Sequence, residues 1–197
     1  IPRGLGIYDD YPFWQTFFHC CGIRVLLSPI SSNLIYEKGV RTIVADNICF
    51  PAKLMHGHVM SLIERHVDRI FYPWVVYERT EDKQAKNSFN CPIVSGYSDV
   101  LRSAIRPEEK YGIPLDAPTI SFKDEKLLRE SLTEYMTRLA PSIRRSEKVI
   151  ASMVNYAVAQ ATDVQNRYLE RIEQRNRQVF DEAQQAGRMA ILLAARP

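Results

Sequence analysis

Cys49 stands just before a segment whose pattern predicts an amphipathic helix. Residues 46–59 read Asp-Asn-Ile-Cys-Phe-Pro-Ala-Lys-Leu-Met-His-Gly-His-Val, with Pro51 in the first helical turn and apolar residues at helical spacing after it. A sulfur at the start of a helix lies near the positive end of the helix dipole, which favours the thiolate over the thiol. The position therefore predicts redox or metal chemistry. The alternative is a small apolar cysteine packed in the core.

A second cysteine repeats this arrangement. Cys91 lies in the run Asn-Ser-Phe-Asn-Cys-Pro-Ile-Val, beside a proline and after an apparent strand. Two thiolates could hold part of an iron–sulfur cluster, since thiolates are its usual ligands. A cubane cluster needs about three or four ligands, so the others would come from Cys20 or Cys21, from a non-cysteine group or from residues outside this chain. Zinc is a weaker alternative because paired Cys-x-x-Cys arms are missing.

Basic side chains follow Cys49 on the predicted helix. Lys53 comes four residues after Cys49, and His56 shares its face, which predicts an electropositive rim beside the sulfur. Lys53 and His56 are therefore candidate cofactor-binding residues, and the alternative is that they are surface polar residues. His56 and His58 point to nearly opposite sides of a helix, so they cannot chelate one ion without unwinding it.

Two further pairs of residues are ambiguous. Glu78 and Arg79 open a polar stretch, residues 78–90, that predicts a long loop; they could bind a polar ligand, but pairing in solvent is favoured. Cys20 and Cys21 end an amphipathic segment, where packing in the core is favoured. The sequence has no G-x-G-x-x-G, Walker or G-x-S-x-G motif, which argues against bound nucleotide and serine hydrolase chemistry.

Alternating strands and helices must position these residues. Apolar runs predict strands at residues 23–27, 40–44, 68–72 and 119–122. Helices are expected at residues 11–21, from Ser31 or Ser32 to Gly39, after Cys49, and at residues 98–105, 125–139 and 141–186. This alternation predicts an α/β fold, a Rossmann-like three-layer sandwich with a mainly parallel sheet and long C-terminal helices. Ligands bind at the carboxyl ends of such strands, where Cys49 and Cys91 are expected to converge.

The organisation of the chain follows from the same pattern. We expect residues 1–123 to form the Rossmann-like α/β domain and residues 124–188 a helical segment that includes a long amphipathic helix, whose charged part, residues 167–185, is solvated. Residues 189–197 read as a buried strand that begins a following, truncated domain. The first residues, Ile-Pro-Arg-Gly, likewise suggest a fragment cut from a longer protein.

Composition narrows the class of protein. The chain has 197 residues, with 26 basic and 23 acidic side chains and a net charge of +3. Its apolar content suits a protein with a real core, and the small net charge argues against nucleic acid and membrane partners. The sequence shows no signal peptide or membrane-spanning run, and its four cysteines do not form a secreted-domain disulfide pattern, so a cytoplasmic location is expected.

Several ordered motifs resemble one known family. They are Tyr11-Pro-Phe-Trp14, Tyr36-Glu-Lys-Gly39, Cys49-Phe-Pro-Ala-Lys-Leu-Met-His-Gly-His58, Phe71-Tyr-Pro73, Tyr77-Glu78, Asn90-Cys-Pro-Ile-Val94 and Leu193-Ala-Ala-Arg-Pro197. Together they span nearly the whole chain. They resemble the uncharacterised domain, labelled DUF2229, of large CoA-enzyme activase proteins that are related to the 2-hydroxyacyl-CoA dehydratases and their ATP-driven activators.

The resemblance implies part of a large protein of anaerobic metabolism, whose ATPase activase module and C-terminal dehydratase-like domain lie elsewhere. In such relatives ATP hydrolysis drives a low-potential electron between iron–sulfur clusters, and the recipient cluster reduces an acyl-CoA or another difficult substrate. By this likeness Cys49 and Cys91 are the metal ligands. A further cysteine often stands at the position of Trp74, and tryptophan cannot ligate iron. Two thiols remain, so the isolated fragment is expected to be inactive.

A non-catalytic module is the competing interpretation. In that case the domain binds a partner or a small molecule, its cysteines are structural, and its long charged helix docks another module. The two interpretations differ in thiol reactivity and in iron binding.

Overall fold

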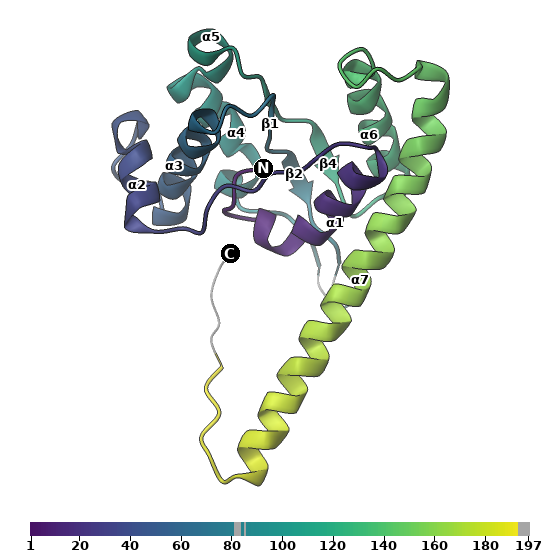
Figure 1. Ribbon diagram of the computed structural model, residues 1–197. Helices are drawn as coiled ribbons and strands as arrows, with labels where there is room; N and C mark the ends of the chain where they lie inside the picture. The colour runs from purple at the N-terminus through teal and green to yellow at the C-terminus, as the bar shows by residue number, and fades with distance from the viewer. Residues whose placement is uncertain (81–83, 85, 193–197) are drawn as a thin grey trace.

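Helices surround two short pairs of parallel strands in this chain (Figure 1). A computed structural model describes residues 1–80, 84 and 86–192, and the structural statements below refer to these residues. The helices are α1 (Ile7–Cys20), α2 (Asn33–Gly39), the 3-10 helix η1 (Val40–Thr42), α3 (Phe50–Glu64), α4 (Pro92–Ile105), α5 (Pro107–Tyr111), α6 (Glu125–Leu139) and α7 (Glu147–Gln185). The strands are β1 (Ile70–Phe71), β2 (Trp74–Tyr77), β3 (Leu115–Asp116) and β4 (Thr119–Ser121).

Prolines divide what is otherwise one parallel ladder. β1 pairs with β3, and β2 pairs with β4. Between these pairs, backbone bonds of 2.9 Å run from the amide of Tyr72 to the carbonyl of Asp116 and from the amide of Trp74 to that of Pro118. Pro73 has no N–H, so the regular strand stops there although the chain stays extended. With α4 and α5 as the crossover, these segments form one strand–helix–strand unit.

The α/β class is therefore confirmed, and the three-layer Rossmann sandwich is not. Residues 23–27 do not form a strand; the amide of Ser28 donates to the carbonyl of Ile1 at 3.1 Å, which places them beside the first residues. The segment 40–44 does not form a strand either. Its first three residues form η1, where the Thr42 hydroxyl donates to the carbonyl of Gly39 at 2.8 Å. Both expectations are wrong because an apolar run becomes a strand only where another strand pairs with it.

One hydrophobic core joins the strands to most helices. Its largest fully buried side chains on α1 are Phe13, Trp14 and Phe17. α1 packs against the first half of α7, where Gln165 accepts from the amide of Phe13 at 3.1 Å and donates to the carbonyl of Asp9 at 2.7 Å. Residues on both sides of position 123 belong to this core, and the division of the chain there stays a prediction.

α7 leaves the core halfway along its length. It begins at Glu147, after the Ser146 side chain caps it, rather than at residue 141. Its charged far half projects beyond the body, which confirms that it is solvated (Figure 1). Residues 189–192 follow α7 without regular secondary structure, and Met189, Ile191 and Leu192 are 87%, 80% and 91% exposed. The strand of a following domain that was expected here stays a prediction. Residues 193–197 lie outside the described residues. Among the helices of the described ranges, none has the length and apolar character to cross a membrane.

Candidate functional site

Cys49 and Cys91 occupy equivalent positions at the starts of α3 and α4. Each is the residue before its helix, with backbone φ and ψ of −60° and 146° at Cys49 and −64° and 147° at Cys91. Each helix has a proline in its first turn, and neither cysteine side chain bonds to the amides of that turn. Both cysteines are exposed. The expected sulfur at a proline-initiated helix start is confirmed for Cys49; for Cys91 the helix was expected only from residue 98, and α4 in fact begins at Pro92.

Tyr72 brings the two cysteines into one neighbourhood. This tyrosine lies between β1 and β2 and is 3% exposed. Burial raises its pKa most, and the charges of Tyr97, Cys91 and Cys49 raise it further. Both thiols therefore lie within electrostatic range of this phenol. α3 and α4 also pack against each other.

His56 lies inside the molecule at the centre of a chain of hydrogen bonds. The Thr42 hydroxyl donates its proton to a backbone carbonyl, so it accepts from His56 Nδ1 at 2.8 Å. His56 Nε2 is then the acceptor for the Tyr97 hydroxyl at 2.9 Å. His56 is fully buried, and burial lowers its pKa to about 4, so the ring is neutral. The expectation of a rim or surface position for His56 is therefore wrong.

Tyr97 carries this chain of hydrogen bonds from α3 to α4. Its side chain projects from α4 and is 1% exposed. Burial raises its pKa to about 12, and the charge of Cys49 contributes. His56 therefore acts on the neighbourhood of Cys49 indirectly, by fixing the Tyr97 hydroxyl.

Lys53 stays near the surface, one turn after Cys49. Its ammonium donates to the carbonyl of Asp46 at 2.7 Å, which ties the segment before Cys49 to the first turns of α3. Its role in binding a cofactor stays a prediction.

A glycine contact fixes α3 against α2. A Cβ atom added to Gly57 would lie 1.7 Å from the carbonyl oxygen of Ile35, and one added to Gly39 would lie 2.2 Å from the amide nitrogen of Gly57. The two backbones touch at this point, so only glycine fits. On the other side of α3, His58 bonds to Ser28 at 2.9 Å and to Ser31 at 3.0 Å. His56 and His58 thus have separate hydrogen-bond partners, as expected for two rings that point to different sides of the helix.

Asn90 fixes the start of α4. Its side-chain amide donates to the carbonyl of Val75 at 3.2 Å and to Glu78 Oε1 at 2.6 Å, and its backbone amide donates to the carbonyl of Val76 at 3.3 Å. These bonds anchor Asn90 to β2, and Cys91 is the next residue. Sequence reasoning did not single out Asn90, because its partners become visible only once β2 is placed.

Arg79 and Glu78 are half-buried and belong to a polar cluster around the buried Asp10, which corrects the expectation that they pair in solvent. The Arg79 guanidinium pairs with the Asp10 carboxylate and lies 3.8 Å above the centre of the Phe122 ring. Asp10 is 3% exposed; burial raises its pKa to about 7, and the charge of Glu78 adds to the shift. Asp10 comes from α1, far away in the sequence, so no local pattern could have revealed the pair.

The other two cysteines lie away from this rim, in and beside the core. Cys21 is buried and Cys20 is half-buried, which agrees with core packing. Burial raises the pKa of the Cys21 thiol to about 12. Across the part of the chain that the structure describes, no three His, Cys, Asp or Glu side chains form a group able to hold a metal. The described thiol donors at the site are therefore Cys49 and Cys91.

Trp74, at the position where the resemblance implies a further cysteine, lies beside α4. A Cβ atom added to Gly96 would approach the indole ring to 3.4 Å, so Gly96 leaves room for this large side chain. Gly96 lies in the second turn of α4, next to the helix start at Cys91. A ligand at position 74 would thus face the helix that one candidate thiol precedes.

These features define a mixed α/β domain with two thiols on neighbouring helix starts, a donor set that suits part of a metal–thiolate site. The model of the family described as CoA enzyme activase uncharacterised domain (DUF2229) matches residues 1–197, and the chain belongs to this family. No curated protein and no solved structure matches the chain significantly.

Proposed function

We propose that this chain is part of a CoA-enzyme activase or 2-hydroxyacyl-CoA dehydratase-like protein. In it, Cys49 and Cys91 supply ligands to an iron–sulfur site used in ATP-driven, low-potential electron transfer. Membership of the activase domain family supports the general kind of protein. The observation that carries the cluster is the pair of exposed thiols, which precede two packed helices and share Tyr72 as a neighbour.

The residues present fit half of such a site. Thiolates are the usual cluster ligands, and first-turn amides that no side chain caps are suited to bond cluster sulfur. Two thiols are fewer than the roughly four ligands of a cubane, so the remaining ligands come from outside the described residues. When bound, the cluster would supply one-electron chemistry. The fit therefore predicts a site completed by another part of the protein.

The surrounding residues hold the thiols and exclude water. Tyr72 and Tyr97 are buried and lie within electrostatic range of Cys49, and His56 bonds to the Tyr97 hydroxyl. Lys53 supplies a positive charge near Cys49, which favours an anionic group there. On this proposal Lys53 contacts the cofactor region, whereas His56 is a positioning residue.

The partners follow from the same proposal. An ATPase activase module would deliver the electron, a C-terminal dehydratase-like domain would carry the rest of the cluster site, and an acyl-CoA would be the final acceptor. The expected setting is the cytoplasm of a cell with anaerobic metabolism. No activity is expected of this chain alone.

Anaerobic reconstitution of the full-length protein with iron and sulfide tests the cluster. We expect bound iron and sulfide and a paramagnetic resonance signal after reduction. The Cys49→Ser, Cys91→Ser double variant is expected to lose them, and the control Cys20→Ser, which changes a half-buried thiol away from the rim, is expected to keep them. Unchanged cluster content in the double variant would eliminate the assignment.

The competing non-catalytic module makes a different prediction. Its structural cysteines would be packed, whereas Cys49 and Cys91 are exposed. Alkylation of the native chain separates the two proposals further. Fast modification at both positions together with iron binding supports the cluster; two resistant thiols and no iron under reducing conditions support the binding module.

A further inference from the structure

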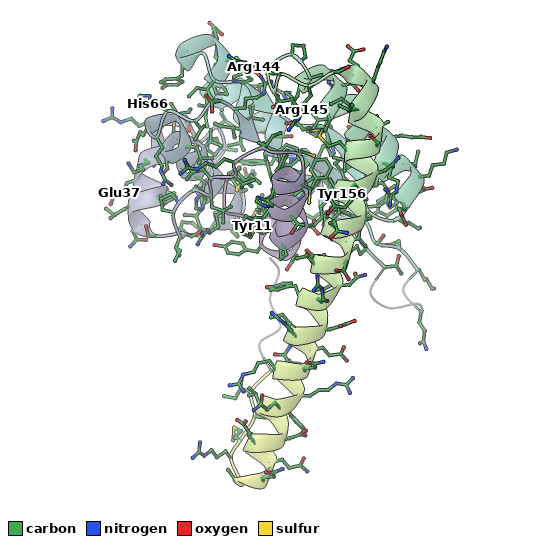
Figure 2. All side chains as sticks on the ribbon, turned by 45° about the vertical axis from the view of Figure 1, so that its right-hand side comes forward. Tyr11, Glu37, His66, Arg144, Arg145 and Tyr156 are labelled. Atoms are coloured by element: carbon green, nitrogen blue, oxygen red, sulfur yellow. The ribbon has the colours of Figure 1, made fainter. Side chains whose placement is uncertain are left out.

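Two carboxyl groups meet beside the first turn of α1. Asp10 lies in this turn and is 3% exposed, and Glu78 follows β2 and is half-buried. Figure 2 labels Tyr11, the residue after Asp10, at this end of α1. The side chains of Glu78 and Asp10 hydrogen-bond to each other. Two ionised carboxylates have no hydrogen to donate, so this contact requires one proton between them.

A single guanidinium balances the two carboxyl groups. Arg79 pairs with Asp10 through Nη1, and its Nη2 is buried without a bond to any described group. Glu78 accepts instead from the neutral side-chain amide of Asn90, at 2.6 Å. If no proton were bound, an excess negative charge would remain in this poorly solvated place, and burial of such a charge is costly.

The surrounding charges also favour a bound proton. Asp9, exposed on the same helix, adds negative charge beside both carboxyl groups. Lys123, after β4, lies over an aromatic ring of β2, and α7 faces this part of α1 with the neutral Gln165. Burial and then the charge of Glu78 raise the pKa of Asp10 to about 7, and burial also raises the pKa of Glu78.

The paired carboxyl groups lie between two helix starts. Glu78 bonds to Asn90, which comes just before Cys91 and α4. A Cβ atom added to Gly6, just before α1, would lie 3.7 Å from Glu78 Oε1 and 3.3 Å from Val94 Cγ1 in the first turn of α4. The starts of α1 and α4 therefore approach each other beside Glu78.

We propose that Asp10 and Glu78 form a proton-binding site whose proton ties the start of α1 to the start of α4. With the proton bound, Glu78 bonds to Asp10 on one side and to Asn90 on the other. Loss of the proton removes the first bond and leaves two like charges, so the two carboxyl groups separate. Asn90 is then held to β2 without the link to α1. The site needs no cluster, so its tests do not depend on the proposed function.

Carbon NMR of the side-chain carboxyl groups of the whole chain, followed against pH, tests the proton. One proton is expected to leave the pair at about pH 7, well above the roughly 4 of ordinary carboxyl groups. Asp10→Asn and Glu78→Gln each remove one charge, and the carboxyl group that remains is expected to ionise about one pH unit lower or more. Ionisation of both groups below about pH 5, or no change in either variant, would overturn the proposal.

Hydrogen exchange tests the tie between the helix starts. The amide of Ser95 donates to the carbonyl of Cys91 at 3.0 Å and reports on the first turn of α4; the amides of α6 are the internal reference. The rate at Ser95 relative to α6 is expected to rise about fivefold once the proton leaves, as for the loss of one hydrogen bond.

Variants of Glu78 separate the proton from the side chain. Glu78→Gln can donate to Asp10 and accept from Asn90 without a proton to lose, so its relative rate should not change with pH. Glu78→Ala removes both bonds and should show the higher relative rate at every pH. A constant ratio in the parent, the same rise in Glu78→Gln, or a low ratio in Glu78→Ala would contradict the proposal.

Discussion

The starts of α3 and α4 share one local geometry but are held from different sides. Each begins after an exposed cysteine in an extended conformation. α3 is fixed from within the helix, by the contact of Gly57 with α2 and by the buried bonds of His56. α4 is fixed from the residue before its cysteine, through the bonds of Asn90 to β2. Similar thiol positions therefore depend on unlike supports, and a substitution can disturb one thiol and spare the other.

Breaking the support of α3 is expected to have the largest effect. Gly57→Ala places a Cβ 1.7 Å from the carbonyl oxygen of Ile35, so α2 and α3 must separate. We expect the free energy of unfolding in urea to fall by about 3 kcal/mol or more. The control is Gly96→Ala in α4, whose Cβ would lie 3.4 Å from Trp74. It is expected to be near neutral, since alanine also favours the helix. Similar losses in both variants would contradict this account.

Acid is expected to weaken α3 through His56. Burial lowers the folded-state pKa of His56 to about 4, from its ordinary 6.5. The stability that depends on its neutral form is complete above about pH 6.5 and is lost as the pH falls through about 4. His56→Gln, which keeps a polar group near Tyr97, should reduce the acid-induced loss of unfolding free energy by on the order of 2 kcal/mol.

The comparison between variant and parent isolates this effect. Asp10, whose pKa is raised to about 7 by burial, changes stability in the opposite direction over the same pH range. His19→Gln, which changes a histidine at an exposed position of α1, is the control. Denaturation curves collected across the acid range measure both, and a parallel pair of profiles for His56→Gln and the parent would refute the prediction.

Breaking the support of α4 is expected to have a smaller and more local effect. Asn90→Ala removes the bonds to Val75 and Glu78, which should lower the free energy of unfolding by about 1.5 kcal/mol. The alkylation rate of Cys91, followed by mass spectrometry, should change while that of Cys49 stays the same. Asn87→Ala changes a nearby exposed residue and should alter neither rate. Equal changes at both thiols would show that the supports are not separate.

Adding a third thiol near Cys91 is expected to have the smallest effect on the fold. Trp74→Cys places sulfur on β2, facing the helix that follows Cys91, and is expected to raise the iron retained after reconstitution. Trp74→Ser removes the same indole without adding a ligand and is the matched control. Equal iron contents in the two variants would argue against a cluster at this rim.

The sequence predicted what depends on neighbouring residues. Local patterns predicted the helix start after Cys49, the cap of α2 at Ser31 or Ser32 and the bounds of α6, and the structure confirms them. The start of α4 at Pro92 lies six residues before the expected one. The expected strands at residues 23–27 and 40–44 required partner strands that a local pattern cannot supply.

The supports of the site were beyond local reasoning for the same reason. The burial of His56 depends on Thr42 and Tyr97, and that of Arg79 on Asp10, which are distant in the chain. A polar residue on an apolar face reads as a surface residue until its partners are placed. The motifs that resemble the family contain Cys49, Cys91 and His56. The structure shows that the two thiols are exposed and that His56 is buried.

Gln165 holds the middle of α7 to α1 and leaves the far half of the helix free, as in a lever. It lies near the middle of the helix, and its side chain grips the backbone of α1 at Asp9 and Phe13. About 30 Å of α7 extends beyond Gln165. A force on the free arm is therefore transmitted to the stretch of α1 that carries Asp10 and, through Arg79, to the end of β2. A partner that binds the far half of α7 can therefore displace residues in the interior of the domain.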